Sequence, residues 1–257
     1  MRKVTMIAAA TLALALAGCG KKDESASTGA TTETGTAPAA SGAASTAPVP
    51  APAGQDWTAT VSATPEGGFR MGNPDAPVKL VEYASLTCPH CAVFANESED
   101  KLLPYVRKGT VSWEFRTFVL NAIDISASLL ARCQGPEPFF KLVEQTYADQ
   151  QSWVTKYQNL TDADTKRIGA LPETQQFAEI AKIGGLDQFY RARGLPEAKG
   201  QACLTDKAGI DALVALRDHG TQKDGVTGTP SFLINGKLAE ETYGWETLEP
   251  KLKAAGA

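Results

Sequence analysis

The four residues Cys88-Pro89-His90-Cys91 constrain the fold of this chain more than any other feature of it. The preceding residues 78–87 are rich in Val, Leu and Tyr, which predicts a strand that becomes buried. The residues after the motif are compatible with a helix, and proline is tolerated in a first helical turn. We therefore expect the two thiols at a strand-to-helix junction, with Cys88 near the N-terminus of the helix.

This position has chemical consequences for Cys88. Unpaired backbone N–H groups and the helix dipole favour negative charge there, so the pKa of the Cys88 thiol is expected to fall. A protonated His90 would add to this effect. Cys91 is placed to attack a mixed disulfide formed at Cys88. The motif predicts a two-step exchange site in which Cys88 is the exposed, low-pKa thiol and Cys91 is the buried, resolving thiol.

A CxxC pair also has two other interpretations. It can be half of a zinc site, which needs two further ligands, usually a second close pair. The chain has five Cys and two His, and Cys133, Cys203 and His219 stand alone in the sequence. A purely structural disulfide is the other alternative, although a tight CxxC loop rarely serves that purpose alone. We prefer redox chemistry, with no metal and no cofactor beyond a redox-active Cys88–Cys91 disulfide.

Two separate segments resemble one protein family. Glu82–Cys91 resembles the active-site segment of the DsbA-like thiol:disulfide oxidoreductases, and Gly225–Gly236 is similar to the cis-proline loop, strand and hairpin of that family. The segments occur in the expected order and, with the helical middle, extend over residues 60–255. The resemblance implies an α/β fold, namely a thioredoxin fold with an inserted all-helical domain.

The resemblance also implies a conformation for Thr229–Pro230. Composition alone favours a trans bond, whereas the family pattern implies a cis bond. A cis bond would set the Thr229 backbone beside Cys88, where a substrate strand could pair with it. Gly228 would leave room for this close approach.

Three residues near the thiols are expected to tune the site: Pro89 and His90 within the motif, and Glu82 before it. The family pattern places an acid beneath the active site, where burial would raise the pKa of Glu82 and let it shuttle the proton of Cys91. The alternative is an exposed residue of an edge strand. One strand position cannot decide burial, so both interpretations of Glu82 stay open.

The start of the chain predicts export. Met1-Arg2-Lys3 is basic, residues 4–17 form an apolar stretch too short for a membrane span, and Leu16-Ala17-Gly18-Cys19 resembles the bacterial lipoprotein cleavage box. We expect residues 1–18 to be a lipoprotein signal peptide and Cys19 to carry a lipid. Ordinary signal cleavage, which would leave Cys19 as a stray thiol, is the alternative. Both routes lead to a compartment that permits disulfides.

The rest of the chain divides into four predicted segments. Residues 19–56 are low in large apolar side chains and rich in Ala, Thr, Ser and Pro, which predicts a disordered tether. Residues 57–122 and 208–257 are assigned to the two parts of the thioredoxin-fold domain. Residues 123–207, where strand signals vanish, are assigned to the helical insertion.

Local patterns predict individual elements. The predicted strands and helices are an edge strand over 57–65, a helix over 89–107 kinked or broken at Pro104, a strand over 111–120, helices over 123–133, 137–149, 173–183, 186–192 and 210–217, a hairpin at Asn235-Gly236, and a closing helix over 243–255.

Cys133 and Cys203 lie in the predicted insertion. In an oxidising compartment two remaining thiols tend to pair, and each lies on a segment of helical spacing that we expect to face the core of the insertion. We therefore predict a structural Cys133–Cys203 disulfide. The alternative is two buried, unpaired cysteines that act as small apolar residues.

These features predict a monomeric, lipid-anchored periplasmic protein that introduces disulfides into exported polypeptides and is reset by a membrane or soluble redox partner. Loss of Arg2 and Lys3 with the signal changes the formal charge from −4 to −6, which argues against nucleic acid as a partner. A reductase or isomerase is one alternative, although isomerases of this superfamily usually carry an N-terminal dimerisation module where this chain has the tether. A non-catalytic, substrate-binding chaperone is another, and the two intact thiols argue against it.

Overall fold

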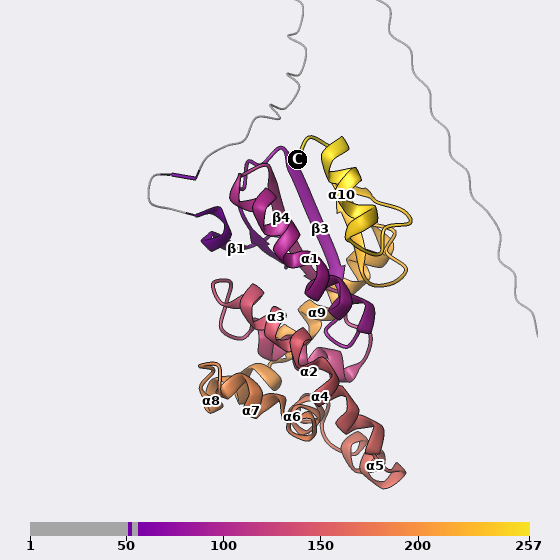
Figure 1. Ribbon diagram of the computed structural model, residues 1–257. Helices are drawn as coiled ribbons and strands as arrows, with labels where there is room; N and C mark the ends of the chain where they lie inside the picture. The colour runs from indigo at the N-terminus through magenta and orange to yellow at the C-terminus, as the bar shows by residue number, and fades with distance from the viewer. Residues whose placement is uncertain (1–50, 53–55) are drawn as a thin grey trace, which may run out of the picture. The chain divides into compact units, whose positions relative to one another are not determined.

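A computed structural model describes residues 51, 52 and 56–257 of the protein (Figure 1). The predicted signal peptide, the lipidation site Cys19 and almost all of the predicted tether lie outside the described residues. Within the described part, no helix combines the length and the apolar character that a membrane span requires.

A six-stranded mixed sheet forms the centre of the fold, in the order β1-β2-β4-β3-β5-β6. The strands β3 and β4 are parallel, and each of the other neighbouring pairs is antiparallel. The strands are β1 (Val61–Ala63), β2 (Phe69–Met71), β3 (Val78–Ala84), β4 (Val111–Thr117), β5 (Ser231–Ile234) and β6 (Lys237–Leu238). The strand that leads to the CxxC motif, β3, is therefore an inner strand.

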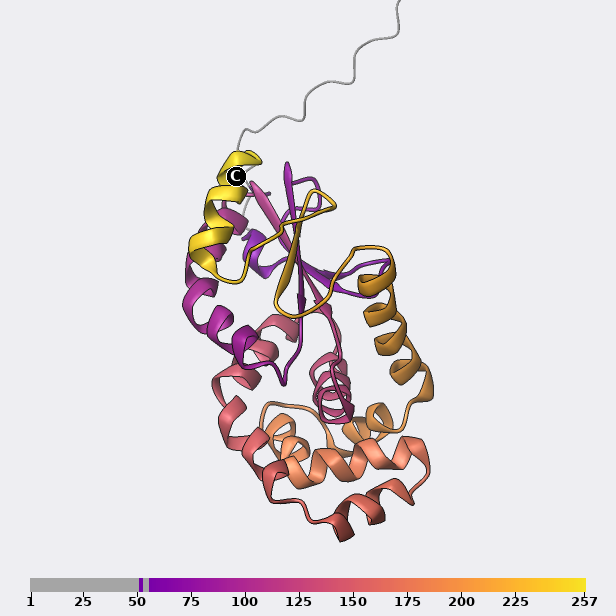
Figure 2. The same ribbon diagram turned by 90° about the vertical axis from the view of Figure 1, so that its right-hand side faces the viewer.

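Helices cover both faces of the sheet (Figure 2). Helices α1 (Pro89–Arg107) and α10 (Trp245–Ala254) lie on one face, and α9 (Lys207–Gln222) lies on the other. All seven residues of β4 are buried, including the polar Ser112 and Glu114. Strands covered on both faces are expected to be buried in this way.

The helical insertion follows β4 and packs against the end of the sheet at which β3 finishes (Figure 1). Its elements are α2 (Ala122–Arg132), α3 (Phe139–Ala148), α4 (Gln150–Val154), the 3-10 helix η2 (Thr155–Asn159), α5 (Asp162–Gly169), α6 (Glu173–Gly184), α7 (Leu186–Arg191) and α8 (Glu197–Leu204). The chain returns to the sheet through α9. The CxxC motif is thus placed between the sheet and the insertion.

The structure corrects several predicted elements. The first part of the predicted edge strand is a 3-10 helix, η1 (Trp57–Ala59), and the edge strand β1 begins at Val61. Helix α1 is not broken at Pro104 but continues through it, and α10 continues through Pro250, as the predicted closing helix does. Both prolines are exposed, so water can satisfy the carbonyl group that each leaves without its helical partner.

The sequence analysis missed several short elements, among them α5 and β2. Helix α5 buries Ile168 alone among its residues, so it has no apolar period to detect, although Thr161 and Asp164 form a capping box at its start. Strand β2 has three residues, too few for an alternation to stand out.

Candidate active site

Cys88 lies where strand β3 gives way to helix α1. It is the N-cap residue of α1, and Pro89 occupies the first turn. Both motif cysteines are free thiols in this structure; Cys88 keeps 5% of its exposed area and Cys91 none. The prediction of an exposed Cys88 is therefore wrong, because the Thr229 carbonyl oxygen lies over its sulfur at 3.3 Å. The residues between the thiols, Pro89 and His90, are the exposed part of the motif.

The surroundings of Cys88 stabilise its thiolate and lower its pKa to about 5. The largest cause is a hydrogen bond from the Cys91 thiol, which outweighs the opposing effect of burial. A hydrogen bond from the Thr229 side chain and the backbone N–H groups of Cys91 and His90 add to it. The sequence analysis predicted a lowered pKa for Cys88 because of the helix N-terminus. The direction is confirmed, but the largest contribution comes from the neighbouring Cys91 thiol.

The pKa of Cys91 moves the opposite way, well above its ordinary value of 9.0. Burial is the largest cause, followed by the hydrogen bond to Cys88 and the negative charge of Cys88; the charge of Glu82 raises it further. Near neutral pH the pair therefore carries one negative charge, on Cys88, and one proton, on Cys91. This division suits a nucleophile and a resolving thiol.

The segment before β5 supplies the opposite side of the site. Its residues 227–231, here called the cis-proline loop, contain the cis Thr229–Pro230 bond expected from the resemblance. Ser231 Oγ donates to the Gly228 carbonyl oxygen at 2.7 Å, which closes the loop on itself. The Thr229 backbone lies beside the Cys88 sulfur, as we expected.

Glu82 is buried in the inner strand β3, with 2% of its area exposed. Its Oε2 accepts a hydrogen bond from the ring N–H of Trp113 at 3.0 Å. A cavity of about 10 Å³ beside it has room for a single water molecule. The burial of Glu82 rules out an exposed edge-strand position and leaves the acid beneath the thiols.

Side chains of the helical insertion form hydrogen bonds to the turn that precedes Cys88. The sequence analysis did not predict these contacts. The Gln150 side-chain amide donates to the carbonyl oxygens of Leu86, at 2.7 Å, and of Cys88, at 3.0 Å. The Tyr147 hydroxyl donates to the Ser85 carbonyl oxygen at 3.1 Å. Neither residue lies near the motif in the chain, and no sequence signal marks either as part of the site.

Asp124 of helix α2 completes this hold from a fully buried position. One carboxylate oxygen accepts from the Leu86 N–H at 2.9 Å, and the other from the Leu120 N–H at 3.0 Å. Burial raises the pKa of Asp124 to about 6, against the lowering effect of hydrogen bonds from the Ser85 side chain and from backbone N–H groups. In the sequence Asp124 looks like an ordinary acid in the first turn of a helix.

An ionic network anchors the start of the segment that leads to the cis-proline loop. Arg116 of β4 donates to Glu114 at 2.6 Å and to the Tyr83 hydroxyl at 3.1 Å. It also donates to Asp224 at 3.1 Å, and Tyr83 donates to the same carboxylate oxygen at 2.7 Å. Because Asp224 follows α9, the network ties this segment to the sheet.

A groove of about 670 Å³ opens beside the thiols. One side is formed by His90 and Val93 of α1 and by the cis-proline loop, and the other by residues 238–243. Val93 and Tyr243 are 51% and 72% exposed. The groove therefore offers apolar surface next to the cis-proline loop.

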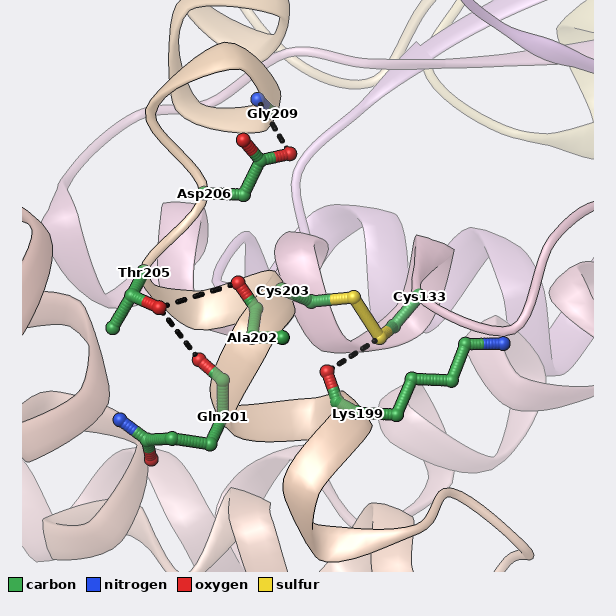
Figure 3. The surroundings of a disulfide bond; sticks show 8 residues. All are labelled: Cys133, Lys199, Gln201, Ala202, Cys203, Thr205, Asp206 and Gly209. Carbon is green, nitrogen blue, oxygen red and sulfur yellow. Dashed lines mark hydrogen bonds between the residues drawn. A yellow bond between two sulfur atoms is a disulfide. The ribbon is translucent and has the colours of Figure 1, made fainter.

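The second cysteine pair lies in the insertion (Figure 3). Cys133 and Cys203 form the disulfide that we predicted, with an S–S distance of 2.04 Å and a Cα–Cα distance of 5.9 Å. It joins the end of α2 to α8. Both residues are half-buried, so the expectation that they face the core of the insertion holds only in part. In the part of the chain that the structure describes, no group of three or more His, Cys, Asp and Glu side chains is arranged to hold a metal ion.

Known proteins share this architecture. The family model described as Thioredoxin matches residues 64–254. A putative protein-disulfide oxidoreductase of Rickettsia bellii is 30% identical over 179 residues, which are 68% of this chain and 60% of that protein. This chain therefore spans less than two thirds of that relative's length.

Solved structures give the same result. A crystal structure of a protein-disulfide isomerase from Novosphingobium aromaticivorans is 34% identical, with a TM-score of 0.69, and the match covers 73% of this chain and 96% of that one. Alpha-DsbA1 of Wolbachia pipientis shares the fold at 24% identity, with a TM-score of 0.58 and coverage of 76% and 93%. The chain belongs to the thioredoxin family, among its DsbA-like thiol:disulfide oxidoreductases.

Proposed function

We propose that this protein oxidises pairs of cysteines in exported polypeptides by exchange at Cys88 and Cys91. The observation that supports this most strongly is the division of pKa values, about 5 for Cys88 and well above 9.0 for Cys91. A low-pKa thiolate is a good leaving group and stabilises the reduced form of the site, and both effects favour passing a disulfide on.

The exchange has two steps. A substrate thiolate attacks Cys88 in the oxidised protein, which breaks the Cys88–Cys91 bond, forms a mixed disulfide at Cys88 and releases Cys91 as a thiolate that takes up a proton. A second substrate thiolate then attacks the substrate sulfur of the mixed disulfide and displaces Cys88 as a thiolate. The substrate dithiol loses two electrons, and the protein gains them as one thiol and one thiolate.

In this scheme, Glu82 in its neutral, protonated form gives Cys91 the proton that it takes up, and Glu82 is left as a carboxylate. It is buried beneath the pair, and its charge acts on Cys91. The adjoining cavity has room for a single water molecule beside the carboxyl group. Pro89 and His90, exposed between the thiols, would meet the substrate first and so adjust the reactivity of the pair.

An isomerase is the second candidate, and one finding favours it. The Novosphingobium aromaticivorans structure, at 34% identity, is named as a protein-disulfide isomerase. In that role the reduced Cys88 thiolate would attack a wrong disulfide in the substrate and leave again after the substrate has rearranged, with no net transfer of electrons.

The cellular setting is part of the proposal. The substrates would be exported polypeptides, met outside the cytoplasm by a monomer whose Cys19 carries a lipid anchor. A membrane or soluble redox partner would reoxidise the Cys88–Cys91 pair, with no other cofactor. The N-terminal residues of the sequence support this setting, and mass spectrometry of the membrane fraction would test for an acylated Cys19.

Two assays on the purified protein test the proposal. The oxidised protein is mixed with a reduced, unfolded polypeptide that holds several cysteines, and the reduced protein with the same polypeptide carrying scrambled disulfides. An oxidase yields disulfides stoichiometrically in the first assay, whereas an isomerase restores the native pattern catalytically in the second. Cys88→Ser abolishes either activity; a Cys88→Ser protein that keeps its full function in cells would instead favour the chaperone.

A further inference from the structure

The groove beside the active site carries charges that neither the fold nor the exchange chemistry requires. Its outer side, residues 238–243, holds two adjacent exposed acids, Glu240 and Glu241. Among the described residues, neither carboxylate forms an ion pair or a hydrogen bond. Both acids line the groove together with the exposed ring of Tyr243.

The lysine that contacts Glu240 forms no ion pair with either carboxylate. The Lys251 ammonium group donates to the backbone carbonyl oxygen of Glu240, not to its carboxylate. Lys251 does not line the groove but a neighbouring hollow, which Glu240 and Leu238 also line. His90 is the one other titratable side chain among the groove residues besides the two acids and Tyr243, and it lies on the opposite side, next to Cys88.

The groove also offers exposed apolar surface. Val93 is 51% exposed, Leu238 is 37% exposed and Tyr243 is 72% exposed, and all three line the groove. The volume of about 670 Å³ lies within the range of roughly 300–1,000 Å³ that is usual for binding pockets. A polypeptide segment is the occupant that fits a groove of this size that is lined by the neighbours of the reactive thiol, by apolar side chains and by two acids.

We propose that this groove selects polypeptide segments in which a lysine or arginine lies a few residues from the reacting cysteine, with Glu240 and Glu241 as the specificity-determining residues. The inference rests on the proposed exchange function and deepens it by naming the class of substrate segment. Apolar atoms of the segment lie against Val93, Leu238 and Tyr243. The basic side chain reaches the two carboxylates and stays clear of His90.

Arginine and lysine suit this site through their stems as well as their charges. Each has a long aliphatic stem that can lie along apolar surface while its charged end stays in water. The exposed Tyr243 ring can also attract a cation over its face. An acidic side chain at the same position would meet repulsion from Glu240 and Glu241.

The test uses short peptides with one cysteine each. Lysine, glutamine or glutamate is placed at each of positions one to four on either side of the cysteine. The rate at which each peptide reduces the oxidised protein is measured at low salt. Because a nearby charge also changes the reactivity of the peptide thiol, each rate is divided by the rate of the same peptide with an uncharged disulfide, bis(2-hydroxyethyl) disulfide.

The expected result is a corrected lysine-to-glutamate rate ratio of about two- to tenfold at one or more positions, since exposed ion pairs are individually weak. High salt lowers the ratio, because it screens exposed charges. The variant Glu240→Gln/Glu241→Gln brings the ratio close to one. Glu246→Gln, which removes an exposed acid that does not line the groove, leaves the ratio unchanged.

Two results overturn the inference. One is a corrected ratio of one at every position while the glutamine peptides react normally; the exchange function then stands and the selectivity is refuted. The other is a ratio that the double variant does not change. If not even the glutamine peptides reduce the protein, the proposed exchange function fails, and the selectivity fails with it.

Discussion

The two cysteine pairs in the described chain occupy opposite kinds of helix end. Cys88 starts helix α1, where backbone N–H groups reach its sulfur, and its partner lies one turn away. Cys133 follows the last turn of α2, and its sulfur lies 3.4 Å from the carbonyl oxygen of Lys199 (Figure 3). A helix start favours a thiolate and a helix end disfavours one. The same side chain is therefore reactive in one place and a passive cross-link in the other.

The sequence separations differ just as much. The reactive pair spans one tight turn, so oxidation and reduction do not require distant parts of the chain to move. The Cys133–Cys203 disulfide closes a loop of 70 residues and joins two helices of the insertion. It therefore restricts the unfolded chain far more than a local link would.

The largest expected effect distinguishes the two cysteine pairs by their contribution to the exchange rate. Cys88→Ser lowers the exchange rate by roughly 10³-fold or more, because the attacked sulfur is gone. Cys133→Ala/Cys203→Ala keeps the rate within about twofold below the unfolding temperature, since that pair lies outside the site. The rate at which a catalytic amount of each protein forms disulfides in a reduced polypeptide, with a small-molecule disulfide in excess as oxidant, measures both. Comparable losses in the two variants would break the distinction between the pairs.

The second largest effect distinguishes the two cysteine pairs by their contribution to the stability of the fold. Cys133→Ala/Cys203→Ala should lower the free energy of unfolding by roughly 4 kcal/mol, an upper guide from the entropy of closing so long a loop. Denaturant titration followed by circular dichroism measures this loss. Thiol counting provides the control, because Cys133 and Cys203 of the Cys88→Ser/Cys91→Ser protein should show no free thiol when the protein is denatured without reductant. An unchanged denaturation midpoint would mean that the disulfide does not support the insertion.

A smaller effect tests the link between the insertion and the reactive pair. The pKa of Asp124 is raised from 3.8 to about 6 in the folded protein, so the folded state binds more protons than the unfolded state between these values. Stability relative to Asp124→Asn should therefore fall as pH rises from about 4 to about 6, by an upper limit of about 3 kcal/mol, and stay level on both sides of that window. Denaturant titrations at several pH values give the difference. If the stability difference between the two proteins does not change across this pH window, burial does not raise the pKa of Asp124.

The features that could be predicted from the sequence are those formed by consecutive residues. The CxxC motif, the loop at Thr229–Pro230 and the hairpin at Asn235-Gly236 are each contiguous, so turn chemistry and the family resemblance could place them. The Cys133–Cys203 pairing was predictable because two cysteines remained once the motif and the lipidation site were set aside.

Contacts made across the fold could not be predicted. Gln150 lies 62 residues beyond Cys88, and Asp124 lies 38 residues beyond Leu86, yet both bind the same turn. No periodicity encodes such a meeting. The burial of Glu82 stayed open for a related reason, since it depends on β3 having a neighbouring strand on each side. Cys88 is buried because the cis-proline loop, far along the chain, packs over its sulfur.

The pH dependence of alkylation of the reduced protein tests the central claim most directly. The Cys133–Cys203 disulfide is kept intact, a small alkylating agent is added at a series of pH values, and peptide mapping by mass spectrometry assigns each label. We predict that Cys88 reacts with a midpoint near pH 5 and that Cys91 stays unlabelled until well above pH 9. Labelling of Cys91 before Cys88 at mildly acidic pH, or a Cys88 midpoint near the ordinary thiol value of 9.0, would contradict the assignment of Cys88 as the nucleophile.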